Sequence, residues 1–126
     1  MTTPGPPRPV AVLQGQLGHG GSERQLSLFL SQCDRTVWAP HVYAASELGH
    51  VADHLRAAGT PVTLLRGSPL RKLRAMRRAV RAQRAQALVS WCSWTNVFAW
   101  ALIGLRVPCV GSFRNAGFAD LPVRGR

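Results

Sequence analysis

Short apolar runs alternate with segments of helical spacing along almost the whole chain. The apolar runs occupy residues 9–13, 36–44, 61–65, 87–90 and 107–112, and the helical segments occupy residues 22–33, 46–59, 69–84 and 95–105. Strands that alternate with helices are joined by right-handed crossovers into a parallel sheet covered on both faces. The pattern therefore predicts a Rossmann-like α/β domain with a parallel sheet of about five strands.

Several local signals refine this expectation. Pro40 lies inside the second apolar run and favours an edge position or a break in that strand, because proline lacks the backbone N–H of a ladder. Ser46 is placed to cap the second helix, and Gly59 is placed to end it. Residues 85–105 carry no charge, but polar side chains interrupt them. A buried strand followed by a largely buried helix explains this stretch better than a membrane span.

Length and composition indicate one domain. The chain has 126 residues, of which 46% are hydrophobic, so it can bury a core. Residues 1–9 are rich in proline and lack the apolar segment of a secretory signal, so we expect a short flexible leader before a domain over residues 10–126. Three cysteines without a paired motif indicate no disulfide framework and favour a reducing, cytoplasmic compartment.

The loop after the first apolar run carries the strongest chemical signal. Glycines stand at positions 15, 18, 20 and 21, and Ser22 to Gln25 have the spacing of a capping box that opens a helix. Glycines let the backbone approach a ligand, and the free N–H groups of a helix N-terminus favour phosphate. The spacing differs from GxGxxG, and no P-loop lysine follows. A loop needed only for a tight strand-to-helix turn is the alternative.

The same loop carries a family resemblance. The segment from Leu17 to Leu26, LGHGGSERQL, resembles the glycine-glycine-small-Glu-Arg segment near the start of family 4 glycosyltransferases of the GT-B fold. Residues 49–62 resemble the second helix and third strand of that family, and residues 107–115 resemble its strand that ends in Ser-x-Arg-Asn. The resemblance implies the N-terminal half of a GT-B fold, which binds the acceptor.

The resemblance also implies a reaction, which is the retaining transfer of a sugar to a glycan or lipid-linked acceptor. A nucleotide-sugar donor is the co-substrate, and no other cofactor is implied. The residues expected at the donor diphosphate or acceptor are Gly18, His19, Gly20, Gly21, Ser22, Arg114 and Asn115. For Arg114 and Asn115, a solvated loop pair is the alternative. No catalytic residue carries over, because Arg-Asn stands where many family members have a histidine.

The family holds its nucleotide chiefly with a C-terminal lobe that contains two glutamates separated by seven residues. This chain ends at Arg126, and none of its five acidic residues forms such a pair in a suitable place. We therefore expect an acceptor-binding lobe that is inactive without a separate C-terminal lobe.

A basic segment follows the third apolar run, and the formal net charge of the chain is +11. The residues expected to meet an anionic membrane surface are Arg71, Lys72, Arg74, Arg77, Arg78 and Arg81. The resemblance implies the same role, since some family members dock on membranes through a basic helix. We expect a cytoplasmic protein that is peripheral to the inner face of the membrane. A solvated outer helix face, whose stripe of Leu70, Leu73, Met76 and Val80 packs on the sheet, is the alternative.

A basic α/β module without enzymatic activity, which binds nucleic acid or a membrane surface, is the alternative function. Nucleic acid is the less favoured partner, because Trp91, Trp94 and Trp100 lie apart from the basic segment and do not interleave with it.

Two histidines also share one predicted helix face. His50 and His54 lie four residues apart and approximate an inverted zinc-protease motif, but Asp53 stands where glutamate is expected. Because no third ligand is evident, we expect a solvated helix surface and no metal site.

Overall fold

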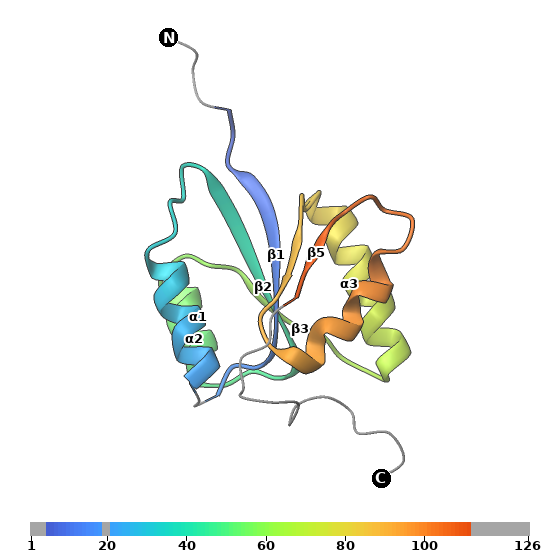
Figure 1. Cartoon of the computed structure of the whole chain (residues 1–126). Coiled ribbons are helices and arrows are strands. Elements are labelled where there is room, and N and C mark those ends of the chain that lie inside the picture. Colours follow the sequence, from blue (N-terminus) through green and yellow to red (C-terminus); the bar gives the residue numbers. More distant parts are fainter. Residues whose placement is uncertain (1–4, 19–20, 112–126) are drawn as a thin grey trace.

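The computed structural model describes residues 5–18 and 21–111, and its elements alternate between strand and helix (Figure 1). They are β1 (Arg8–Gln16), α1 (Gly21–Ser31), β2 (Trp38–Glu47), α2 (His50–Ala57), β3 (Val62–Leu64), α3 (Pro69–Gln83), β4 (Leu88–Ser90), the 3₁₀ helix η1 (Ser93–Leu102) and β5 (Cys109–Val110). All strand pairs are parallel, and the strand order is β3-β2-β1-β4-β5. The predicted Rossmann-like α/β fold with five parallel strands is confirmed.

The helices form two layers, one on each face of the sheet (Figure 1). The chain moves outward from β1 to β2 and β3, and then returns across the sheet to β4 and β5. Right-handed crossovers in opposite directions place their helices on opposite faces. The helices α1 and α2 therefore cover one face, and α3 and η1 cover the other.

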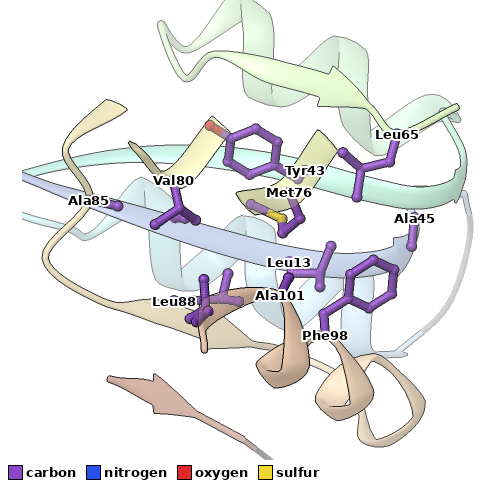
Figure 2. Close-up of a cluster of buried hydrophobic side chains, with 12 residues drawn as sticks. Leu13, Tyr43, Ala45, Leu65, Met76, Val80, Ala85, Leu88, Phe98 and Ala101 are labelled. Carbon is purple, nitrogen blue, oxygen red and sulfur yellow. The ribbon is translucent and has the colours of Figure 1, made fainter. Parts of the chain in front are cut away.

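Each layer has its own apolar core. Figure 2 shows Met76 of α3 and Phe98 of η1 around Leu13 of β1 and Tyr43 of β2. On the other face, the buried side chains of α1 and α2 pack against Val12, Val42 and Trp91. Successive residues of β1 thus feed both cores, which explains why its sequence is continuously apolar.

The helix termini agree in part with the predicted signals. Ser68 caps α3, because its Oγ accepts a hydrogen bond from the N–H of Arg71, and Pro69 occupies the first turn. Gly59 has a φ of +89° just beyond α2, as predicted for a helix stop. The predicted cap of α2 is wrong, because Ser46 lies in β2 and its Oγ donates to the carbonyl of Gly15 at 2.7 Å. Gly49 takes the capping position instead.

The prediction for Pro40 also needs correction, because Pro40 lies in β2, between β1 and β3 in the sheet. The N–H of Val42 and the carbonyl of Ala44 face β3, so the nitrogen of Pro40 faces the same side. However, β3 pairs only with residues 42–44 of β2. The missing N–H of Pro40 therefore falls where no neighbouring strand requires it, and proline is tolerated within an interior strand.

The predicted buried helix over residues 95–105 is replaced by η1. A 3₁₀ helix has three residues per turn, so residues three apart share a face. Thr95, Phe98 and Ala101 are buried on one face, whereas three large apolar side chains on the other face are exposed: Val97, Trp100 and Ile103. The helix is therefore half-exposed rather than largely buried.

The uncharged stretch of residues 85–105 forms β4 and η1, as expected for a strand followed by a helix. Within the described part of the chain, no helix combines the length and the apolar character that crossing a membrane requires.

Candidate functional site at the carboxyl edge of the sheet

The strand order creates a switch point between β1 and β4. These two strands are neighbours, but the chain leaves them toward opposite ends of the sheet. In open parallel sheets, the loops diverge at such a point and leave a crevice at the carboxyl ends of the strands. The loop from β1 to α1 and the loop from β4 to η1 therefore define the candidate site.

Buried polar side chains gather at this switch point. Five polar or charged residues of the described chain are buried, and four of them lie here: Gln14, Glu23, Ser90 and Thr95. Gln14 ends the apolar part of β1, Glu23 lies in the first turn of α1, and Ser90 and Thr95 flank the end of β4. Burying polar groups costs free energy unless they are hydrogen-bonded. Four buried polar side chains in one place therefore mark this edge of the sheet as a candidate functional site.

Ser22 joins the two sides of the site. The amide Nε2 of Gln14 donates to Ser22 Oγ at 3.1 Å, and Trp91 Nε1 donates to the Ser22 carbonyl at 2.8 Å. The start of α1 is thereby fastened to both β1 and β4. Gln14 Oε1 is buried and has no hydrogen-bond partner within the described residues. Its side chain thus keeps an unused acceptor beside the hydroxyl of Ser22.

A second hydrogen-bonded group holds the loop after β4. The hydroxyls of Ser90 and Thr95 lie 2.6 Å apart, and Thr95 Oγ1 donates to the carbonyl of Cys92 at 2.8 Å. Both hydroxyls are fully buried. This group fixes the start of η1 relative to β4, and Cys92, just before η1, is half-buried.

The glycine loop is anchored to the start of α2. The N–H of Val51 donates to the carbonyl of Leu17 at 3.0 Å, and the N–H of Leu17 donates to the carbonyl of Glu47 at 3.2 Å. The loop passes so close to Gly49 that a Cβ there would lie 2.5 Å from the carbonyl oxygen of Leu17. In contrast, a Cβ at Gly18 or Gly21 would meet no atom within 4 Å. The backbone at these two glycines therefore faces open space.

A groove with a volume of about 550 Å³ lies between α1 and α2. Its lining residues are Gly18, Gly21, Arg24, Ser27, His50, Val51 and His54. Nε2 of His50 and Nε2 of His54 are 3.0 Å apart, and their rings meet edge to face. The lining contains basic and neutral side chains and no acid, so its electrostatic character favours electron-rich ligands.

The basic residues of α3 divide into two groups. Lys72 Nζ donates to the carbonyl of Ala45, and Arg77 donates to the carbonyls of Ala101 and Ile103. These two side chains therefore bind the protein's own backbone. The other four predicted membrane-surface residues are exposed and line one face of the helix: Arg71, Arg74, Arg78 and Arg81. Of these, Arg74, Arg78 and Arg81 have side chains without a hydrogen bond or ion pair within the described chain.

The layer formed by α3 and η1 also carries exposed apolar side chains. Arg77 contacts the end of η1, where Trp100 and Ile103 are 69% and 62% exposed. Leu70 at the start of α3 is also exposed. Cationic and large apolar side chains are therefore both exposed on α3 and η1, which form one layer on the same face of the sheet (Figure 1). We call this surface the α3–η1 face, defined by Leu70, Arg71, Arg74, Arg78, Arg81, Val97, Trp100 and Ile103.

The structure describes some of the predicted site residues and not others. The structure brings Gly18, Gly21 and Ser22 together at the carboxyl edge of β1. His19, Gly20, Arg114 and Asn115 lie outside the described residues, so their predicted roles stay predictions. Sequence reasoning did not assign Gln14, Ser90 or Thr95 to the site. The one available signal was that each is a polar residue at the carboxyl end of an apolar run, or just beyond it.

The fold and the switch point define a parallel α/β protein with buried polar side chains at the carboxyl edge of its sheet. No family model, no curated protein and no solved structure matches the chain. No cluster of three or more histidine, cysteine or carboxylate side chains suited to a metal occurs among the described residues.

Proposed function

We propose that this chain is the acceptor-binding lobe of a retaining glycosyltransferase. In this proposal, a sugar passes from a nucleotide-sugar donor to a glycan or lipid-linked acceptor, and a second lobe supplies most of the nucleotide contacts. The observation that carries the proposal is the meeting of a glycine loop, a helix start and four buried polar side chains at the switch point of a parallel sheet. The resemblance of residues 17–26 to family 4 glycosyltransferases supports the same assignment.

The local chemistry suits a diphosphate. Gly18 and Gly21 present backbone without side chains, so phosphate oxygens can approach the N–H groups of the first turn of α1. Ser22 Oγ already accepts a hydrogen bond from Gln14, so its own proton remains available for an anionic oxygen. We assign no catalytic residue.

The test uses calorimetry or NMR titration of the purified chain with UDP and GDP. We expect Gly21→Ala to weaken nucleoside diphosphate binding about tenfold or more while leaving stability unchanged, because the added Cβ meets only open space. Gly5→Ala is the matched control, since Gly5 also faces open space but lies before β1. The diphosphate site is disproved if Gly21→Ala binds both nucleotides as the wild type does.

A separate assay tests the need for a second lobe. We expect the chain alone to transfer no sugar from UDP-glucose or GDP-mannose to glycan or polyprenyl-phosphate acceptors. Measurable transfer by the purified chain would show that the present residues suffice for catalysis, and it would contradict the two-lobe part of the proposal.

The α3–η1 face supports a second function, which is peripheral binding to an anionic membrane. Its arginines suit lipid phosphates, while Trp100 and Ile103 suit the boundary between headgroups and acyl chains. This combination of charge and exposed apolar surface favours a membrane over a nucleic acid. The proposed lobe would then meet a lipid-linked acceptor at the surface that carries it.

Sedimentation with vesicles tests this second function. We expect binding to vesicles that contain phosphatidylglycerol and little binding to phosphatidylcholine alone, with loss of binding in the variant Arg74→Glu/Arg78→Glu. Trp100→Ala tests the apolar contribution separately. Equal binding to both vesicle types would exclude a specific interaction of the protein with anionic lipids. A salt-dependent gel shift with random oligonucleotides that exceeds vesicle binding would favour the nucleic-acid alternative.

A further inference from the structure

The histidine pair of α2 has the geometry of a chelate. His50 and His54 are four residues apart, so their side chains lie one above the other on the same helix face. Their Nε2 atoms are 3.0 Å apart, and both residues are exposed. Neutral imidazole nitrogens are among the commonest protein ligands of transition metals. The two groups therefore reach a single point in the groove without any change in the backbone.

The separation of the two nitrogens selects among metals. With metal–nitrogen bonds of about 2.0–2.1 Å, nitrogens 3.0 Å apart subtend an angle of about 91–97° at the metal. A tetrahedral ion prefers a wider angle, whereas square-planar and octahedral ions prefer about 90°. The pair therefore suits Ni²⁺ or Cu²⁺ better than Zn²⁺. The rings now meet edge to face, and rotation about χ2, which is a soft torsion in histidine, directs both Nε2 lone pairs to one ion.

The surroundings leave room for further ligands. His50 and His54 both line the groove of about 550 Å³, so further ligands of a metal held by the pair would lie in this groove. Arg24 also lines the groove and has no ion pair or hydrogen bond within the described residues. An anion that completes the coordination shell would lie near this guanidinium. The negative charge of the anion would offset the repulsion between Arg24 and the metal.

We propose that His50 and His54 form a two-histidine site for a divalent transition metal of the Ni²⁺ or Cu²⁺ type, with open positions that face the groove between α1 and α2. The sequence alone led us to expect no metal here, because a third protein ligand is not evident. The structure adds the distance between the two nitrogens and the space in which solvent or an anion serves as the remaining ligands.

The test is calorimetric titration of the full chain with NiCl₂ after removal of bound metals with EDTA. We expect one site per chain, and we expect His50→Ala and His54→Ala each to weaken Ni²⁺ binding at least tenfold. The electron paramagnetic resonance spectrum of the Cu²⁺ form provides a second readout, because it reports coordination by two nitrogens. Circular dichroism confirms that each variant is folded, since both histidines are exposed and their loss leaves the core intact.

Two controls separate a chelate from unspecific binding to imidazole. His41→Ala should leave Ni²⁺ binding unchanged, because His41 hydrogen-bonds to Thr63 and stacks on Tyr43 away from the groove. The variant His54→Ala/Ala57→His keeps the number of histidines but places the pair seven residues apart, so binding should stay weak. The proposal is overturned if this displaced pair binds as tightly as the wild type, or if the His50→Ala/His54→Ala variant retains the site. The outcome is independent of the glycosyltransferase proposal.

Discussion

At the scale of single residues, the close approach of the glycine loop to α2 sets the strictest steric requirement near the site. Gly49 touches the backbone of Leu17 and Gly18, so no flexible side chain can move away to make room. At the same place, the N–H of Val51 donates a hydrogen bond to the carbonyl of Leu17 and holds the loop against α2. The shape of the candidate site therefore depends on a residue outside its lining.

We expect Gly49→Ala to lower the free energy of unfolding by about 1–3 kcal/mol, because the added methyl group overlaps a carbonyl oxygen that is held by a hydrogen bond from Val51. Urea titration followed by tryptophan fluorescence measures this change. Gly21→Ala is the matched control and should leave stability nearly unchanged. Equal stability of the two variants would contradict the close approach.

Tyr43 provides a prediction about pH. Burial raises the pKa of its phenol from the ordinary value of 10.0 to about 12, and its hydroxyl donates to Gln83 Oε1 at 3.0 Å. The native state thus keeps the proton that the unfolded state releases, so stability is complete below about pH 10 and falls as the pH rises from 10 to 12. Because Tyr43 is the one tyrosine of the chain, absorbance at 295 nm reports its titration directly.

We expect the phenol absorbance to change near pH 12 in buffer and near pH 10 in concentrated urea. Tyr43→Phe should flatten the loss of stability between these values. A native titration near pH 10 would show that the phenol is hydrated, which its buried position in Figure 2 opposes.

At the scale of elements, neighbouring arginines of α3 have different surroundings. Arg77 lies between Leu73 and Val80 in the helical repeat, so it belongs to the inward face and reaches the carbonyls at the end of η1. Arg78 points outward. The two differ by one position in the sequence and by about 100° around the helix.

We expect Arg77→Ala to destabilise the protein by about 1–3 kcal/mol, because carbonyls of η1 lose charged donors. Arg78→Ala should change stability by less than about 0.5 kcal/mol, since its side chain has no partner to lose. Thermal unfolding of the two variants makes the comparison. A larger effect at Arg78 than at Arg77 would contradict the division of the basic residues.

The elements also show how far sequence reasoning extends. The alternation of apolar runs predicted every strand and the layered sheet, because hydrophobic periodicity reflects burial directly. The spacing of Leu73, Met76 and Val80 also carried the signal that Arg77 faces inward, which the prediction of a uniform basic surface did not use.

Other features depend on contacts that are distant in sequence. Pro40 is tolerated because β3 is short, and Gly49 is required because the glycine loop passes beside it. The gathering of Gln14, Ser90 and Thr95 follows from the pairing of β1 with β4, which no local pattern encodes. The apolar residues of η1 recur every three positions in the sequence. However, an α-helix over the same residues would be equally compatible with their apolar composition.

At the scale of the whole molecule, positive charge is both abundant and poorly compensated. The formal net charge is +11, and α3 contains six basic residues and one neutral polar residue, Gln83, but no acid. Self-repulsion of such a surface opposes the compact state and is screened by salt.

We expect the melting temperature to rise by several degrees between 10 mM and 300 mM NaCl, because screening removes more repulsion than attraction. Arg74→Gln/Arg78→Gln should reduce this dependence on salt, since it removes two unpaired charges. Calorimetry at both salt concentrations measures the effect. A melting temperature that falls with salt would show that attractive ion pairs dominate instead.

The place of Pro40 also bears on how the protein behaves at high concentration. The first residues of β2 extend beyond β3 and present an open strand edge, the type of surface on which another chain can add a strand. Proline offers no donor at this edge, and β3 and β5, which form the two outer edges, are only three and two residues long. The fold thereby discourages edge-to-edge aggregation. Pro40→Val should restore the donor and increase light scattering during prolonged storage at high concentration.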